Sequence, residues 1–261
     1  MPERSAGQPA HPTPGLVGPT LAGTVLASVV VLVAQVVWVV RRKLPTLVGL
    51  DVSGPLADHH PGDPLRMVVL GDSTLTGPGL ASAADVWLRQ ALAEIDLGRP
   101  VELVSLARGG SRVADVRGQV EAATAVGADV AVLAVGANDA IHGTAPRRFA
   151  ADLDETIAHL LDHVSVIAVA NLGDLGNLAR VPRPLTVVLR RRSRTICRRI
   201  EDVVAGHERA VLLDVTTGNL GFRDRSVFAA DLFHPARAGH AIWARAARPG
   251  LEAMLSRMAT P

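Results

Sequence analysis

The apolar and polar residues of this chain form two patterns, a long apolar segment near the N-terminus and a repeated alternation from residue 65 onward. In the alternating part, short runs rich in Val, Leu, Ile and Ala are separated by longer amphipathic stretches. Short apolar runs bounded by turn residues are typical of strands buried on both faces of a parallel sheet. The alternation therefore predicts an α/β fold, a three-layer α/β/α sandwich with helices on both faces of a central parallel sheet. The predicted strands are 66–70, 101–106, 130–135, 164–170 and 210–214, and the predicted helices are 82–96, 112–126, 147–162, 184–206 and 236–258.

The N-terminal part combines a polar tail with a segment long enough to cross a membrane. Residues 1–14 are rich in Pro, Gly, Ser and His, which is typical of disordered chain. The segment 15–43 is charged only in its last three residues, and 21–40 would span a hydrocarbon core of about 30 Å at about 1.5 Å per residue. Trp38 and the basic end fit an interfacial anchor and a charged stop. We expect a retained transmembrane helix and basic stop over 15–43, with a cleaved signal peptide as the alternative.

The charges beside this helix bear on its orientation. Three basic residues follow the apolar segment and one, Arg4, precedes it, so the positive-inside rule favours a cytoplasmic globular part over an extracytoplasmic one. Residues 44–64 contain four prolines and three glycines and are expected to form a linker. The His59-His60 pair in this linker has no third ligand nearby, so we expect no metal site there. Residues 65–261 are expected to form one globular domain.

Composition limits the partners and cofactors. The 27 basic residues nearly balance the 25 acidic ones, and aromatic residues make up only 3% of the chain. Nucleic-acid binding needs a basic face with stacking aromatic side chains, so nucleic acid is not expected as a partner. The one cysteine, Cys197, excludes a disulfide within this chain and a metal site built from cysteines. We expect Cys197 to be a small buried side chain on a helix.

Polar residues and glycines follow the predicted strands, where ligands and catalytic groups of open α/β sheets gather. The first strand is followed by Gly71-Asp72-Ser73-Thr74, the second by a segment with Gly109-Gly110, and the third by Gly136-Ala137-Asn138-Asp139. Near the C-terminus, Asp231 and His234 are three residues apart and can meet within one tight turn. Acyl transfer to a serine needs a base, a carboxylate that orients the base, and hydrogen-bond donors for the oxyanion. These segments supply residues of each type.

The blocks, in this order and spacing, resemble the SGNH (GDSL-type) hydrolase superfamily of esterases and lipases over about residues 65–258. The resemblance implies a flavodoxin-like sandwich in which Ser73 is the nucleophile. It implies that His234 is the general base and later the general acid, and that Asp231 orients His234. The motif G-x-S-x-G is absent, so the nucleophile turn of the α/β-hydrolase fold is not expected.

The resemblance also implies an oxyanion hole made of the Ser73 N–H, the Gly110 N–H and Asn138 Nδ2, with Gly109 as an alternative to Gly110. One departure is Ser105, which stands where the family often has Asn. The implied reaction is hydrolysis of a small-molecule or lipid carboxylic ester through an acyl-serine intermediate, without metal or cofactor. The alternatives are a thioesterase or lysophospholipase, a glycan O-acetylesterase if the domain is extracytoplasmic, and a non-catalytic binding module.

Several polar residues near these blocks have structural interpretations. We expect Asp72 and Asp139 to cap turns or helix starts, and His240 to be structural. Arg108 either favours an anionic group at the mouth of the site or points to solvent. On the helix 184–206, Arg190, Arg191, Arg194 and Arg198 are predicted to share one face. This Arg190–Arg199 face is either solvated or a second contact with anionic lipid headgroups.

Overall fold

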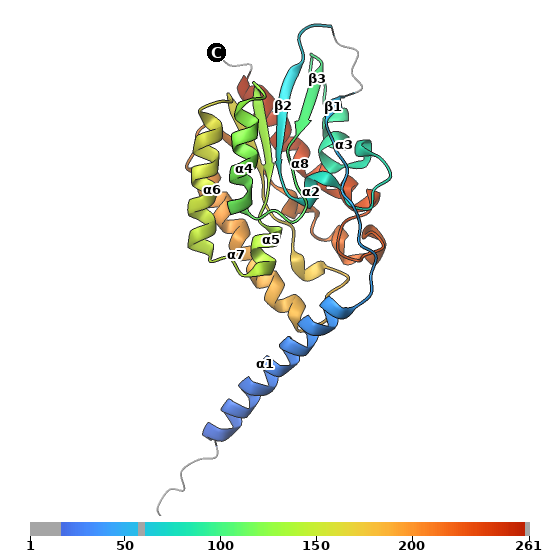
Figure 1. Cartoon of the computed structure of the whole chain (residues 1–261), viewed down its shortest axis with the longest axis vertical. Coiled ribbons are helices and arrows are strands. Elements are labelled where there is room, and N and C mark those ends of the chain that lie inside the picture. The colour runs from blue at the N-terminus through green and yellow to red at the C-terminus, as the bar shows by residue number, and fades with distance from the viewer. Residues whose placement is uncertain (1–16, 57–60, 259–261) are drawn as a thin grey trace, which may run out of the picture. The chain divides into compact units, whose positions relative to one another are not determined.

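The computed structural model describes residues 17–56 and 61–258, which divide into two compact units between Arg42 and Lys43 (Figure 1). The disorder predicted for residues 1–14 and the interpretation of His59-His60 concern positions outside the described residues. The first unit contains a single described helix, and the second contains the whole sheet.

Helix α1 (Val17–Arg41) is apolar, with a mean hydropathy of 2.4 over Ala22–Arg41. At its end the Arg42 guanidinium lies 5.1 Å from the centroid of the Trp38 ring, a cation–π contact. Among the described residues, α1 alone has the length and composition needed to cross a membrane, and signal sequences near an N-terminus share these properties.

The second unit is built on a six-stranded sheet with the strand order β1-β3-β2-β4-β5-β6. Strands β2 to β6 run parallel, as the apolar runs predicted, and β1 at the edge of the sheet pairs antiparallel with β3. The strands are β1 (Gly54–Pro55), β2 (Leu65–Gly71), β3 (Val101–Ser105), β4 (Val130–Ala134), β5 (Val166–Ala170) and β6 (Ala210–Leu213). Because β3 and β4 lie on opposite sides of β2, the strand order reverses beside the carboxyl end of β2, which is where open α/β sheets place their ligands.

Helices cover both faces of this sheet, which confirms the predicted α/β/α sandwich (Figure 1). The helices are α2 (Ser73–Thr76), α3 (Trp87–Ala93), α4 (Val113–Thr124), α5 (Ala137–His142), α6 (Pro146–Leu161), α7 (Leu185–Ala205) and α8 (Arg237–Met258). Alternate residues of β2 enter different cores, since Val68 and Leu70 pack with α4, α6 and α7, whereas Met67 and Val69 pack with α3 and α8. The short helices α2 and α5 escape prediction because four to six residues are too few to display a helical period.

The helix predicted over 82–96 is divided. A 3₁₀ turn at Ala83–Asp85 precedes α3, and Val86 between them is extended, with φ −70° and ψ 136°. Single 3₁₀ turns also occur at Leu175–Asn177, Val215–Gly218, Gly221–Arg223 and Arg225–Val227. The other predicted helices and strands agree with the observed ones to within two residues at each end.

The segment 44–64 differs from the linker that its prolines and glycines predicted. Its described part packs on the domain, where Val52 is fully buried and β1 extends the sheet. The Leu50 N–H donates to the Thr76 carbonyl at 2.6 Å, and the Arg89 guanidinium donates to the Val52 carbonyl at 2.9 Å. The extended backbone therefore finds hydrogen-bond partners in the domain, and the compact unit begins near residue 43 rather than at residue 65.

The arginine face predicted on α7 is smaller than expected. Arg190 pairs with Asp174, Arg192 donates to the Ala140 and Thr144 carbonyls, and Arg199 pairs with Asp202. The first two side chains are therefore bound within the domain, whereas the Arg199–Asp202 pair is exposed. The face is reduced to the exposed Arg191, Arg194 and Arg198, and its contact with lipid remains a prediction.

Candidate active site

The candidate nucleophile follows a close approach between two strands. β2 ends at Gly71, with φ +135°, and a Cβ atom at this position would overlap the Ala134 carbonyl oxygen of β4. The Asp72 N–H donates to that same oxygen at 3.0 Å. Only glycine allows both the approach and the positive φ, so the chain can turn directly into α2 with Ser73 as its first residue.

A buried glutamine holds this turn from the next helix. Gln119 of α4 accepts from the Gly71 N–H at 2.7 Å and donates to the Gly71 carbonyl at 3.0 Å. Its amide also donates to Ser111 Oγ at 3.1 Å, which ties the first glycine-containing block to the second. Gln119 was not among the residues predicted from the sequence. The available signal was a polar residue within the buried stripe that includes Val116 and Val120.

Asp72 acts as a cap, which confirms its predicted structural role. Its Oδ1 accepts from the Thr74 N–H at 2.9 Å, at the start of α2. Oδ2 is buried without a hydrogen-bond partner among the described residues. Burial raises the pKa of Asp72 to about 6, and the nearby Asp139 carboxylate adds to the rise. Asp139 in turn accepts from the N–H of Val113, the first residue of α4, at 2.9 Å.

Asp231 and His234 meet within one turn. The carboxylate Oδ2 lies 2.6 Å from His234 Nδ1, and Oδ1 accepts from the backbone N–H groups of Phe233 and His234, each at 3.0 Å. Leu232 takes a left-handed conformation with φ +58°, the only positive φ of a non-glycine residue in the described chain. The hydrogen bonds to Asp231 hold this turn, so a buried carboxylate fixes the orientation of the imidazole ring.

Besides the Ser73 N–H, the predicted oxyanion donors come from the segments that follow β3 and β4. Gly109 and Gly110 line one recess together with Ser73 and His234. A Cβ atom at Gly109 would lie 3.8 Å from the Ser73 Cβ, whereas Gly110 has open space beside it and φ +84°. Asn138, in the first turn of α5, donates one amide hydrogen to the Ser111 carbonyl at 3.0 Å. That bond fixes the amide plane and leaves its second hydrogen for another acceptor.

Two recesses meet at Ser73 and His234. We call the first the apolar recess, and its walls come from the ends of β4, β5 and β6, from α2 and α3, and from α8 and the segments before it. The chain has four Phe and three Trp, and five of these line it, namely Trp87, Phe222, Phe228, Phe233 and Trp243. The second, which we call the polar recess, is lined by the following residues besides Ser73 and His234: Leu47, Gly49, Leu50, Asp51, Thr76, Pro78, Ser105, Ala107, Gly109 and Gly110.

The remaining polar residues near the site have structural roles or face solvent. His240 is fully buried, its Nδ1 accepts from the Trp87 N–H at 3.2 Å, and burial lowers its pKa to about 3, so the ring is neutral. Arg108 is exposed, and its backbone N–H donates to the Gly71 carbonyl at 3.0 Å. Cys197 is buried on α7 as expected, and burial raises the pKa of its thiol to about 12. Within residues 17–56 and 61–258, no group of three or more His, Cys, Asp or Glu side chains could hold a metal ion.

We predict that Asp72→Asn stabilises the protein at neutral pH. The pKa of Asp72 rises from 3.8 to about 6 on folding, so the folded chain binds more protons and the wild-type free energy of unfolding falls as pH rises through this interval. The variant keeps an oxygen that can accept from the Thr74 N–H, and its free energy of unfolding should exceed that of the wild type by up to about 3 kcal/mol near pH 8.

Urea unfolding at about pH 4 and about pH 8 measures this difference. The matched control is Asp63→Asn at an exposed position, which should give no pH-dependent difference. An Asp72→Asn effect of equal size at both pH values would contradict the prediction.

Comparisons with known proteins agree with this architecture. Residues 69–242 match the model of the GDSL-like Lipase/Acylhydrolase family. A search of curated proteins finds no match.

Solved structures of similar fold include TesA, with 22% identity and a TM-score of 0.59 over 72% of this chain and 99% of that one. The psychrotrophic esterase EstA from Pseudoalteromonas sp. has 13% identity and a TM-score of 0.59, covering 74% of this chain and 99% of EstA. The acetylxylan esterase Axe2 from Geobacillus stearothermophilus has 17% identity and a TM-score of 0.57, covering 72% of this chain and 94% of Axe2. The family match spans most of the second unit and includes both Ser73 and His234, and the chain therefore belongs to the GDSL-like lipase/acylhydrolase family.

Proposed function

We propose that this protein is a serine esterase that hydrolyses carboxylic esters through an acyl-serine intermediate, with Ser73 as the nucleophile. The observation that carries the proposal is the 2.6 Å contact between Asp231 Oδ2 and His234 Nδ1, in a turn whose imidazole lines the same recesses as Ser73. A serine needs such an oriented base to become a nucleophile near neutral pH.

In the proposed reaction, Asp231 accepts the Nδ1–H of the neutral imidazole, so Nε2 of His234 is free to take the Ser73 proton. Ser73 Oγ then attacks the ester carbonyl, and His234 returns the proton to the departing alcohol. In the second half His234 takes a proton from the water that attacks the acyl-serine. It returns this proton to Ser73 Oγ as the acyl–oxygen bond breaks and the carboxylic acid leaves. No step requires a metal or cofactor.

The oxyanion of each tetrahedral intermediate would be bound by backbone and amide donors. We assign these as the Ser73 N–H, the Gly110 N–H and the second hydrogen of Asn138 Nδ2. Gly110 is favoured over Gly109 because its open surroundings and positive φ suit a backbone that turns an N–H toward a ligand. Donors fixed in advance stabilise the developing charge at little reorganisation cost.

The two recesses suggest how an ester is placed. An ester carbonyl at Ser73 would direct one substituent into the apolar recess and the other into the polar recess, which contains Asp51 and Ser105. We assign the acyl group to the apolar recess because aromatic and aliphatic side chains gain most from covering apolar surface. A glycan O-acetylesterase is a second candidate, since the structural neighbours include an acetylxylan esterase. Hydrolysis profiles on aryl esters, acyl thioesters, lysophospholipids and acetylated xylan separate these substrate classes.

Ser73→Ala should lower hydrolysis of p-nitrophenyl butyrate by roughly 10⁴-fold or more and abolish labelling by a fluorophosphonate probe, because the attacking oxygen is gone. Its melting temperature should stay near the wild-type value. Ser226→Ala, at an exposed serine, is the matched control and should keep both activities. Undiminished hydrolysis by Ser73→Ala would refute the nucleophile, and a wild type that neither labels nor hydrolyses would favour a binding module.

Asn138→Ala should lower kcat by roughly 10² to 10³ with a much smaller change in KM, because the amide acts on charge that develops after substrate binding. Asn138→Asp, which keeps the shape but lacks the donor, should lose a comparable factor. Steady-state kinetics measure both, and melting curves separate any loss of the bond to the Ser111 carbonyl. A kcat within about twofold of wild type for both variants would remove Asn138 from the oxyanion hole.

We propose that α1 is retained as a membrane anchor and that the domain lies on the cytoplasmic side. The apolar segment Ala22–Arg41 and the basic residues at its end support this orientation. The chain should resist carbonate extraction from membranes, and protease should cut the domain only after cells are lysed. A mature chain cleaved within residues 17–43 would indicate a signal peptide, and cutting in intact cells would place the domain outside.

A further inference from the structure

One wall of the apolar recess is a loop without regular pairing to the sheet. Residues 171–178 follow β5, contain the 3₁₀ turn at Leu175–Asn177, and are here called the wall loop. Seven of these eight residues line the recess, all except Gly176. Leu175 and Leu178 are each only 8% exposed and supply apolar surface. The position of this loop therefore sets the shape of the recess on that side.

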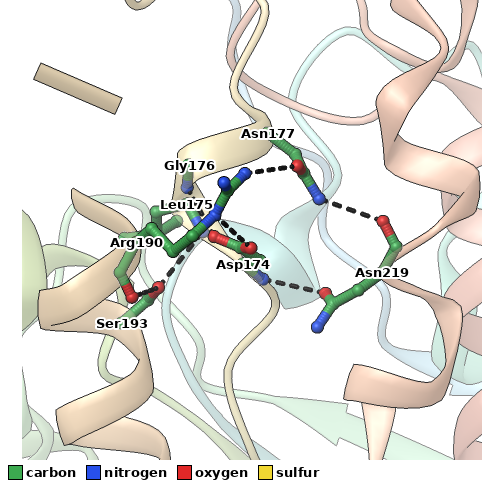
Figure 2. Close-up of polar contacts among 7 residues, drawn as sticks. All are labelled: Asp174, Leu175, Gly176, Asn177, Arg190, Ser193 and Asn219. Atoms are coloured by element: carbon green, nitrogen blue, oxygen red, sulfur yellow. Dashed lines mark hydrogen bonds and ion pairs between the residues drawn. The ribbon is translucent and has the colours of Figure 1, made fainter. Parts of the chain in front are cut away.

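The wall loop is held by side chains from two other segments (Figure 2). On one side, Arg190 Nε of α7 donates to Asp174 Oδ2 at 2.7 Å, and its Nη2 donates to Asn177 Oδ1 at 3.1 Å. On the other side, Asn219 Oδ1 accepts from the Asp174 N–H at 2.8 Å, and the Asn219 carbonyl accepts from Asn177 Nδ2 at 3.0 Å. We call these four residues, Asp174, Asn177, Arg190 and Asn219, the clasp. Its two members in the wall loop, Asp174 and Asn177, are each bound by both Arg190 and Asn219.

Two further contacts join the wall loop to α7, and one more hydrogen bond lies within the loop. The Leu175 N–H donates to Ser193 Oγ at 3.3 Å, and Asp174 Oδ1 accepts from the Gly176 N–H at 2.8 Å. A Cβ atom at Gly176 would lie 2.7 Å from the Arg190 Cβ, so the loop backbone and α7 touch with no room for a side chain. Because Ser193 is itself buried in the domain, α7 provides a rigid support for the loop.

The choice of arginine fits this role. The Asp174 side chain is only 12% exposed, whereas the Arg190 side chain is 39% exposed. Solvent therefore reaches the guanidinium more than the carboxylate and screens this ion pair only in part. A guanidinium presents several donors in a fixed plane and here reaches two acceptors of the loop at once. Lysine would keep the charge but would not hold both acceptors in that geometry. Arg190 itself does not line the recess.

We propose that the clasp fixes the wall loop as the surface against which an acyl chain packs, and that Arg190 is a positioning residue for acyl-chain selectivity. The inference rests on the proposed esterase function, with the acyl group in the apolar recess. Without Arg190, the Asp174 carboxylate loses its charge partner and Asn177 loses a donor, so the loop moves. Hydrolysis of esters whose acyl chain is long enough to contact the wall loop should therefore change more than hydrolysis of esters with a short acyl chain.

The test compares hydrolysis of p-nitrophenyl acetate and p-nitrophenyl octanoate by the full-length protein. In Arg190→Met, the ratio of kcat/KM for octanoate to that for acetate should fall about tenfold, roughly what close packing of one to two methylene groups contributes. The loss should lie mainly in KM for octanoate, because the reacting groups at Ser73 are not altered. Arg190→Lys should restore part of the ratio, since it keeps the charge without the double contact.

The matched control is Arg199→Met, on the same helix in an exposed pair with Asp202, which should leave the ratio unchanged. If Arg190→Met does not fold, Ser193→Ala removes another loop contact from outside the recess and should shift the ratio in the same direction. A lower melting temperature with an unchanged ratio in Arg190→Met, or an unchanged ratio in Ser193→Ala where that variant replaces it, would overturn the proposal. If the wild type hydrolyses neither ester and takes up no fluorophosphonate, the proposed function fails instead.

Discussion

The close approach of β2 and β4 at Gly71 is the constraint on which the site depends. A side chain there would displace the Ala134 carbonyl, which also accepts the Asp72 N–H, so the turn into Ser73 exists only because the strands meet backbone to backbone. Gln119 then binds both polar groups of Gly71 and connects the turn to Ser111. The carboxyl ends of β2, β3 and β4 are thereby joined into one rigid platform, on which positioned donors can act without moving.

Buried carboxylates in this domain serve two different purposes. Asp72 directly precedes Ser73 and Asp139 directly follows Asn138, but each accepts from a backbone N–H at a helix start, and burial raises the pKa of both. Asp231 instead directs one oxygen to His234 and the other to two backbone N–H groups of its own turn. Proximity to Ser73 along the chain is therefore a poor guide to function, because the orientation of each carboxylate decides which proton it can influence.

The distribution of aromatic residues concentrates binding capacity in a chain that has few of them. The chain has four Phe and three Trp side chains, and five of them line a single recess beside Ser73 and His234. They come from α3, from the 3₁₀ segments after β6, from the turn that contains Asp231 and His234, and from α8, and the wall loop after β5 also lines the recess. The recess is thus assembled from segments distant in sequence, and the clasp, which includes the Arg190–Asp174 ion pair, binds the wall loop to the rest of the domain.

The sequence by itself determined the layer architecture, because buried parallel strands need continuous apolar runs and their covering helices need an amphipathic period. It also determined which residues are candidates for chemistry, since Ser73, Asn138 and the Asp231-His234 pair stand in blocks whose order is characteristic of a family. Tertiary structure alone decided the packing of residues 44–56, the role of Gln119 and the partner of Arg190, as each depends on contacts between segments far apart in the chain. The periodicity of apolar residues indicates which side of a helix or strand is buried. A hydrogen bond between residues more than ten positions apart produces no repeating pattern in the sequence. The walls of the site and the contacts that support them are therefore visible only in the folded structure.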